Sequence, residues 1–127
     1  MSETWISGSG TSLSYEEVLE EIRRYDPEEV FVGGDSQPKK DEIVFVEAIC
    51  VLRKSLGGRF WTCKKRVDDK RFPVMSLRLI YEVNLACMVA ISLRDHVSPR
   101  ITIHIDVSPE KKNKSNKVAE QAISYIK

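Results

Sequence analysis

Three acidic side chains lie in apolar surroundings where a carboxylate could carry out chemistry. Asp35 follows an apolar run and two glycines, Glu82 is the only acidic residue between positions 75 and 94, and Asp106 ends an alternating β-branched run. Carboxylates that are brought together repel one another unless a divalent cation neutralises them. Mg²⁺ suits such a cluster, because it takes few protein ligands and keeps waters and phosphate oxygens. Two such ions can clamp the attacking and leaving oxygens of a phosphodiester.

Each of the three acids also has a simpler interpretation. A Gly-Gly-Asp sequence after an apolar run describes a strand that enters a turn. Arg78 lies four residues before Glu82, so the two side chains could form a surface ion pair on a helix. Asp106 precedes a Val-Ser-Pro sequence and could hydrogen-bond its own backbone in a turn. The catalytic hypothesis therefore depends on whether the fold brings the three acids together.

The elements that would position these acids follow from hydrophobic periodicity and turn residues. Apolar β-branched runs predict strands, and apolar residues spaced three and four apart predict helices. Ser14 and Glu17 form a capping-box pattern at the start of the first helix, which an Asp-Pro pair ends. Strands are expected at residues 30–34, 43–52, 59–67 and 101–106, and helices at residues 15–25, 75–94 and 115–126.

The order α, β, β, β, α, β, α predicts an α/β domain built on a mixed sheet. The first three strands form an antiparallel meander, and the long helix crosses over to a fourth strand parallel to an earlier one. If the first and fourth strands are parallel neighbours, Asp35 and Asp106 lie at the same edge of the sheet. The expected domain spans residues 14–127, and the polar residues 1–13 are expected to form a flexible leader.

This combination of motifs resembles the ribonuclease H-like superfamily. Gly-Gly-Asp-Ser-Gln at 33–37, and His-Ile-Asp-Val-Ser-Pro at 104–109, most closely resemble the uncharacterised bacterial YkuK-type ribonuclease H-like family, as does the segment from Ser76 to Glu82. The resemblance implies a ribonuclease H-like fold with a metal-nuclease site. In that site Asp35 bridges Mg²⁺ or Mn²⁺ ions, and Glu82 and Asp106 are further ligands.

The chain departs from the ribonuclease H-like pattern at its C-terminus. Domains of this fold usually continue with a fifth strand and a helix that carries a fourth acidic or histidine ligand. This sequence ends at Lys127, in or just after the helix that follows the fourth strand. We therefore expect a domain that is incomplete at the C-terminus, with weakened metal binding and an exposed sheet edge that favours a homo-oligomer.

Composition favours a globular protein in a reducing compartment. The 42% of hydrophobic and 31% of charged residues are typical of a folded domain. Three widely spaced cysteines without a CxxC pair argue against a disulfide framework or zinc knuckle and predict a cytoplasmic location. No apolar run approaches the length of a membrane span, so no membrane partner is expected.

Charge is unevenly distributed along the chain. Residues 1–35 carry nine acidic and two basic side chains, whereas the remaining residues carry ten acidic and eighteen basic ones. A basic body is compatible with a polyanionic partner such as nucleic acid, although a solvated mixed surface explains the same counts. The lysines expected to follow a phosphate backbone are Lys39, Lys40, Lys112 and Lys114.

Two further polar residues are weaker candidates. His104 is two residues from Asp106 and shares its strand face, so it could assist at the site or simply be a structural histidine. Glu47 stands alone in the second apolar strand and is expected to pair with Lys64 or Lys65 on the neighbouring strand.

Two functional hypotheses follow from these observations. The leading one is a divalent-metal-dependent phosphodiesterase that acts on nucleic acid, with Asp35, Glu82 and Asp106 as its catalytic metal ligands. The alternative is a catalytically inactive nucleic-acid-binding or assembly module that keeps the same fold.

Overall fold

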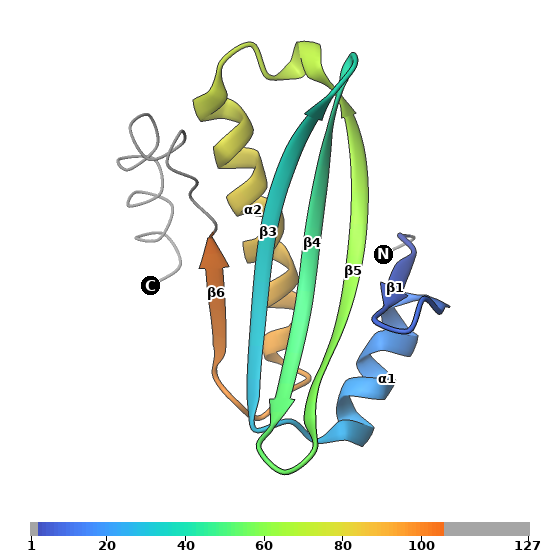
Figure 1. Cartoon of the computed structure of the whole chain (residues 1–127). Helices are drawn as coiled ribbons and strands as arrows, with labels where there is room; N and C mark the ends of the chain where they lie inside the picture. The colour runs from blue at the N-terminus through green and yellow to red at the C-terminus, as the bar shows by residue number, and fades with distance from the viewer. Residues whose placement is uncertain (1–2, 106–127) are drawn as a thin grey trace.

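The structure, a computed structural model, describes residues 3–105 (Figure 1). Its sheet has six strands in the order β2-β1-β5-β4-β3-β6, which confirms the predicted mixed α/β fold. The elements are β1 (Trp5–Ser7), β2 (Ser12–Leu13), α1 (Tyr15–Tyr25), β3 (Glu29–Lys39), β4 (Glu42–Arg53), β5 (Gly57–Asp68), a short 3₁₀ turn η1 (Asp69–Arg71), α2 (Met75–Arg94) and β6 (Ile101–Ile105). The predicted helix at residues 115–126 lies outside the described residues.

Strands β3, β4 and β5 form the predicted antiparallel meander, but they are longer than expected. The β3–β4 ladder runs from the Glu29–Leu52 pair to the Lys39–Glu42 pair. A two-residue turn closes it, with Asp41 in the left-handed region at φ 64°. The prediction ended the first strand at residue 34 because a glycine pair and Pro38 usually interrupt strands. Cross-strand pairing with β4 carries β3 through both features.

Strand β6 lies beside β3 and parallel to it, as the crossover rule predicts. The register runs from the Val30–Ile101 pair to the Gly34–Ile105 pair. Asp35 and Asp106 are the next residues in the sequence after that last pair. Asp106 itself lies outside the described residues.

Both helices lie on one face of the sheet. Along β3 the even-numbered residues point to this face, because successive side chains of a strand alternate. Val30 and Val32 are fully buried there, in one core with Leu93 of α2 and Ile22 of α1. Figure 1 shows α2 crossing behind β3 and β4, so the opposite face of these strands is turned to the viewer.

Gly34 brings α2 close to β3. A Cβ atom at this position would lie 3.4 Å from the Glu82 carbonyl oxygen and 3.5 Å from the Ala86 Cβ. These are ordinary van der Waals distances, so one methyl group fits here and a larger side chain would have to push the helix away from the sheet. At this position Glu82 and Ala86 of α2 lie directly against the strand that carries Asp35.

Residues 3–13, within the expected flexible leader, contain two short strands in this structure. Strands β1 and β2 form a small hairpin, and β1 pairs with β5 as the next strand of the sheet. Trp5 is only 1% exposed and packs against Tyr15 of α1. A single large aromatic side chain can anchor a short segment, because it buries as much apolar surface as several small residues. The Ser- and Gly-rich composition hid that anchor.

Helix α2 has the predicted bounds, residues 75–94. The prediction that no apolar run approaches the length of a membrane span was wrong for this helix. By length and composition alone it could cross a membrane, with a mean hydropathy of 1.5. In this fold Leu79, Val83 and Leu93 are buried against other elements. In all, 39% of the window with that mean hydropathy is buried within the described fold.

Candidate functional site

Asp35 lies on the face of the sheet opposite the helices. It follows Gly34 on β3, so its side chain points to the other face, and it is partly buried. Its cross-strand neighbour on β4 is Val46, which in turn pairs with Lys64 of β5. The carboxylate therefore lies within the sheet surface, with an aliphatic neighbour on one side and a cation one strand farther on.

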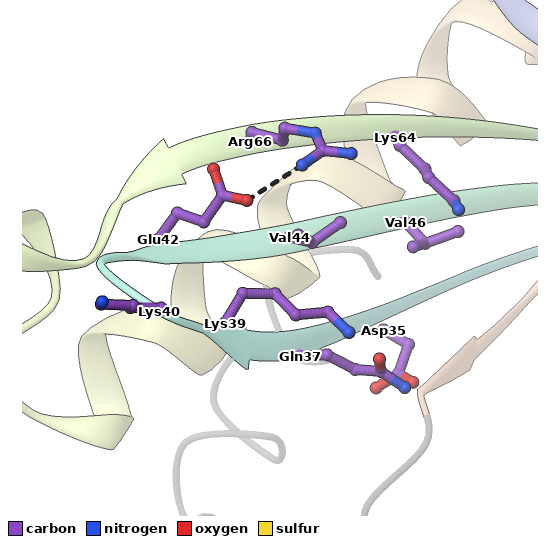
Figure 2. A pocket seen from close by; sticks show the side chains of 9 residues that line it. All are labelled: Asp35, Gln37, Lys39, Lys40, Glu42, Val44, Val46, Lys64 and Arg66. Carbon is purple, nitrogen blue, oxygen red and sulfur yellow. Dashed lines mark hydrogen bonds and ion pairs between the residues drawn. The ribbon is translucent and has the colours of Figure 1, made fainter.

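A shallow hollow of about 600 Å³ surrounds this carboxylate (Figure 2). Val44 and Val46 of β4 form its floor, and polar side chains from β3 and β5 stand on both sides. The residues that line the hollow are Asp35, Gln37, Lys39, Lys40, Glu42, Val44, Val46, Lys64 and Arg66. Four of them are cations and two are acids, so the hollow carries net positive charge.

The sequence anticipated only part of this basic surface. Lys39 and Lys40, predicted to contact phosphate, do line the hollow. Lys112 and Lys114 lie outside the described residues. Lys64 and Arg66 were missed as members of the site, because their position depends on the register of β5 against β4. That register follows from the Gly57 turn, where φ is 85°, and an explicit pairing of the hairpin would have placed both residues opposite Val46 and Val44.

Glu82 is held on the helix-covered side of the sheet. It is only 2% exposed, and its Oε1 accepts a hydrogen bond of 2.6 Å from the Ser36 hydroxyl. The Arg78 guanidinium donates to the same hydroxyl at 2.8 Å and to the Ser36 carbonyl at 3.1 Å. The alternative interpretation placed Arg78 and Glu82 in a surface ion pair, whereas here both side chains contact Ser36 and Glu82 is buried.

The structure therefore brings Glu82 to the residue next to Asp35 in the chain. Because Ser36 and Asp35 alternate along β3, the two carboxylates approach the strand from opposite faces. The described pairing of β3 with β6 ends at Gly34, immediately before Asp35. Convergence of Asp35, Glu82 and Asp106 on one cation stays a prediction, since Asp106 is not among the described residues.

His104 and Glu47 lie away from the Asp35 hollow. His104 is exposed on the same open face as Asp35, and its ring packs against Phe31 with centroids 5.3 Å apart. Glu47 lies under the helices, opposite Gly34 on one side and Cys63 on the other. Burial, helped by the charge of Glu3, raises the pKa of Glu47 to about 7.

Glu47 does not form the expected lysine pair. It is 7% exposed, and its Oε2 atom has no hydrogen-bond partner among the described residues. The positive charge of Lys65 acts on it and lowers its pKa, but desolvation is the larger effect. Lys64 points to the other face, beside Val46.

The donor chemistry of Asp35 fits a hard divalent cation. Carboxylate oxygens are ligands that Mg²⁺ and Mn²⁺ take, and partial exposure leaves room for waters and phosphate oxygens. Within residues 3–105, no group of three or more histidine, cysteine or acidic side chains is placed to hold a metal ion. Of the three predicted ligands, Asp35 and Glu82 are among these residues and Asp106 is not.

Comparison with known proteins identifies the family. No curated protein and no solved structure matches the chain. A family model described as Ribonuclease H-like, however, matches residues 14–127. These residues include every strand of the meander, helix α2 and β6. This match covers most of the chain and agrees with the sheet order observed for β5, β4, β3 and β6. The chain belongs to the Ribonuclease H-like family.

Proposed function

We propose that this protein is a divalent-metal-dependent phosphodiesterase that acts on nucleic acid in the cytoplasm. The observation that carries the proposal is the position of Asp35, a partly buried carboxylate at one end of a hollow lined by four cations. An isolated carboxylate in such a hollow would weaken phosphate binding. A carboxylate that holds a cation would instead add to the attraction for phosphate.

Different residues of the chain would bind the phosphate, hold the metal and position its ligands. Lys64 and Arg66 line the same hollow as Asp35 and would bind a phosphate group there. Asp35, Glu82 and Asp106 would hold Mg²⁺ or Mn²⁺, and the metal would polarise the phosphate and stabilise charge that develops on its oxygens. The contacts of Ser36 with Glu82 and Arg78 fix α2 against β3, so they position Glu82 relative to the neighbouring Asp35.

A second function, a catalytically inactive nucleic-acid-binding or assembly module, is favoured by a specific observation. Glu82 is buried and bonded to Ser36 on the side of the sheet opposite the basic hollow. A carboxylate held there could stabilise the fold alone. In that case the basic hollow would bind nucleic acid without cleaving it.

Metal titration by calorimetry tests the leading proposal. Wild-type protein is expected to bind Mn²⁺ or Mg²⁺ in the millimolar range or tighter, and Asp35→Asn is expected to lose at least tenfold in affinity. Asp95→Asn is the matched control, because Asp95 is an exposed carboxylate at the C-terminus of α2, away from the hollow. Metal binding that is equal in wild type and Asp35→Asn would remove the enzyme proposal.

Cleavage assays then separate the two functions. Single-stranded RNA, single-stranded DNA and an RNA–DNA hybrid are incubated with Mn²⁺ and either wild-type protein or Asp35→Asn. Cleavage of any substrate that depends on Asp35 supports the phosphodiesterase. Binding without Asp35-dependent cleavage supports the inactive module.

A further inference from the structure

The open face of the meander has a regular pattern across its strands. Cross-strand pairing aligns Asp35, Val46 and Lys64 in one row, and Gln37, Val44 and Arg66 in the next. In both rows an aliphatic residue of β4 lies between polar residues of β3 and β5. The open face is therefore a furrow along β4, with an apolar floor and polar walls.

The width of this furrow is close to that of one polynucleotide strand. Its walls, β3 and β5, are two strand spacings apart, which is about 9.6 Å between their backbones. A single strand can lie between them, with phosphates against the cationic walls and sugars or bases over the valines. A duplex carries two backbones on a wide, rigid cylinder and would contact only the rims of the furrow.

The other end of the same face is aromatic. Two rows beyond Asp35, Phe31 of β3 and Phe60 of β5 lie on either side of Cys50. Phe60 is 50% exposed, and the Phe31 ring lies tilted at 54° against the ring of the exposed His104. Unpaired bases stack on exposed aromatic rings with little regard to sequence. Phe31 is four residues from Asp35, about 13 Å along the strand.

We propose that the furrow over β4 binds single-stranded nucleic acid, with phosphates on Lys64 and Arg66 and bases on the Phe31–Phe60 end. The charge of the hollow and the aromatic end are the two features that fit this partner, because only an unpaired strand offers phosphates and free base faces together. The path passes Asp35, so this inference rests on the proposed function and names the substrate class of that site.

One residue works against phosphate binding in the furrow. Glu42 forms an ion pair with Arg66, in which Oε1 and Nη1 are 3.0 Å apart. The Arg66 side chain is 69% exposed. An incoming phosphate must compete with this carboxylate for the guanidinium. Glu42→Gln should therefore tighten binding, whereas loss of the cations should weaken it.

Fluorescence anisotropy in EDTA measures binding without cleavage. A labelled single-stranded RNA or DNA oligonucleotide is compared with the same strand in a duplex. Wild-type protein is expected to bind the single strand at least fivefold more tightly than the duplex. The double variant Lys64→Ala/Arg66→Ala is expected to lose at least tenfold in affinity for the single strand. Its slope of log K against log salt should fall by about 1.4, the value for two phosphate contacts.

Matched variants make the test specific. Arg24→Ala/Lys54→Ala removes two exposed cations that lie outside the furrow, and it should change affinity less than twofold. Glu42→Gln should increase affinity two- to fivefold. Phe31→Ala should weaken single-strand binding with no change in salt slope, because stacking releases no counterions.

The outcomes also distinguish this inference from the proposed function. Single-strand binding that depends on Lys64 and Arg66, without any Asp35-dependent cleavage, would support the furrow and remove the phosphodiesterase. Tighter binding of the duplex, or equal losses in the two double variants, would overturn the furrow, while Asp35-dependent cleavage would still stand.

Discussion

The side chains of Ser36 and Glu82 form a buried hydrogen bond of 2.6 Å that joins strand β3 to helix α2. Arg78, one turn earlier on the helix, contacts the hydroxyl and the carbonyl of the same serine. The strand and the helix are therefore fixed to one another one residue away from Asp35. Gly34, on the other side of Asp35, allows the same close approach.

Replacement of Ser36 should reveal the stability that this contact provides. Ser36→Ala removes a donor to Glu82 and an acceptor from Arg78, so a buried carboxylate loses a hydrogen bond. We expect a loss of about 1–3 kcal/mol in the free energy of unfolding, measured by urea denaturation. Ser98→Ala, at an exposed position after α2, should change stability by less than about 0.5 kcal/mol. Equal effects of the two variants would show that the Ser36 contact adds no stability.

Gly34 should tolerate one added carbon and no more. Gly34→Ala places a Cβ 3.4 Å from the Glu82 carbonyl, at the short end of ordinary contact, so its effect on stability should be small. Gly34→Val adds two further methyl groups against α2 and should cost about 1–3 kcal/mol. Urea unfolding of the two variants checks this order. A valine variant as stable as the alanine variant would mean that α2 is free to move away from β3.

The buried Glu47 should make stability fall as pH rises. Its pKa is raised from 4.5 to about 7 in the folded protein, chiefly by burial. Between these two values the folded state binds more protons than the unfolded state, so the free energy of unfolding decreases with increasing pH. Protein stability measured at pH 5 and pH 8 should show this loss in wild type.

Glu47→Gln is the control for the pH effect, because glutamine does not titrate. The difference in unfolding free energy between the variant and wild type should grow in favour of the variant from pH 5 to pH 8. A constant difference over that range would contradict the assignment of a raised pKa to Glu47.

Trp5 should be essential to the docked N-terminal hairpin. Its side chain is 1% exposed, and Trp5→Ala would leave a large void beside Tyr15. We expect a loss of about 3–5 kcal/mol, with Ile6→Ala as the control since Ile6 is 38% exposed. Thermal unfolding followed by circular dichroism provides the measurement. Loss below about 1 kcal/mol for Trp5→Ala would restore the view of residues 1–13 as a flexible leader.

The sequence predicted the elements whose signals are local. The capping box at Ser14 and Glu17 forms as expected, and the apolar spacing of residues 75–94 gives the bounds of α2. The parallel position of β6 follows from the helical crossover that precedes it rather than from any single residue. These features depend on backbone preference and periodicity, which are visible in one chain.

The parts that were missed depend on register and on long-range contact. Lys64 joins Asp35 only because both pair with Val46. The alternation within either strand does not show this, and only pairing the two strands from the turn at Gly57 would have revealed it. The contact of Glu82 with Ser36 depends on how α2 packs against the sheet, which is a long-range contact that no local pattern shows. The sequence showed the acids, but not the face of the sheet that each one occupies.

The pairing of β1 with β5 has a practical consequence for work with this protein. The family match begins at residue 14, so a chain trimmed to that boundary would lose β1, β2 and Trp5. The backbone of β5 would then present unpaired N–H and C=O groups along residues that now bond to the hairpin. Bare strand edges recruit other chains, so the trimmed protein should form intermolecular sheets more readily than the chain that keeps its hairpin.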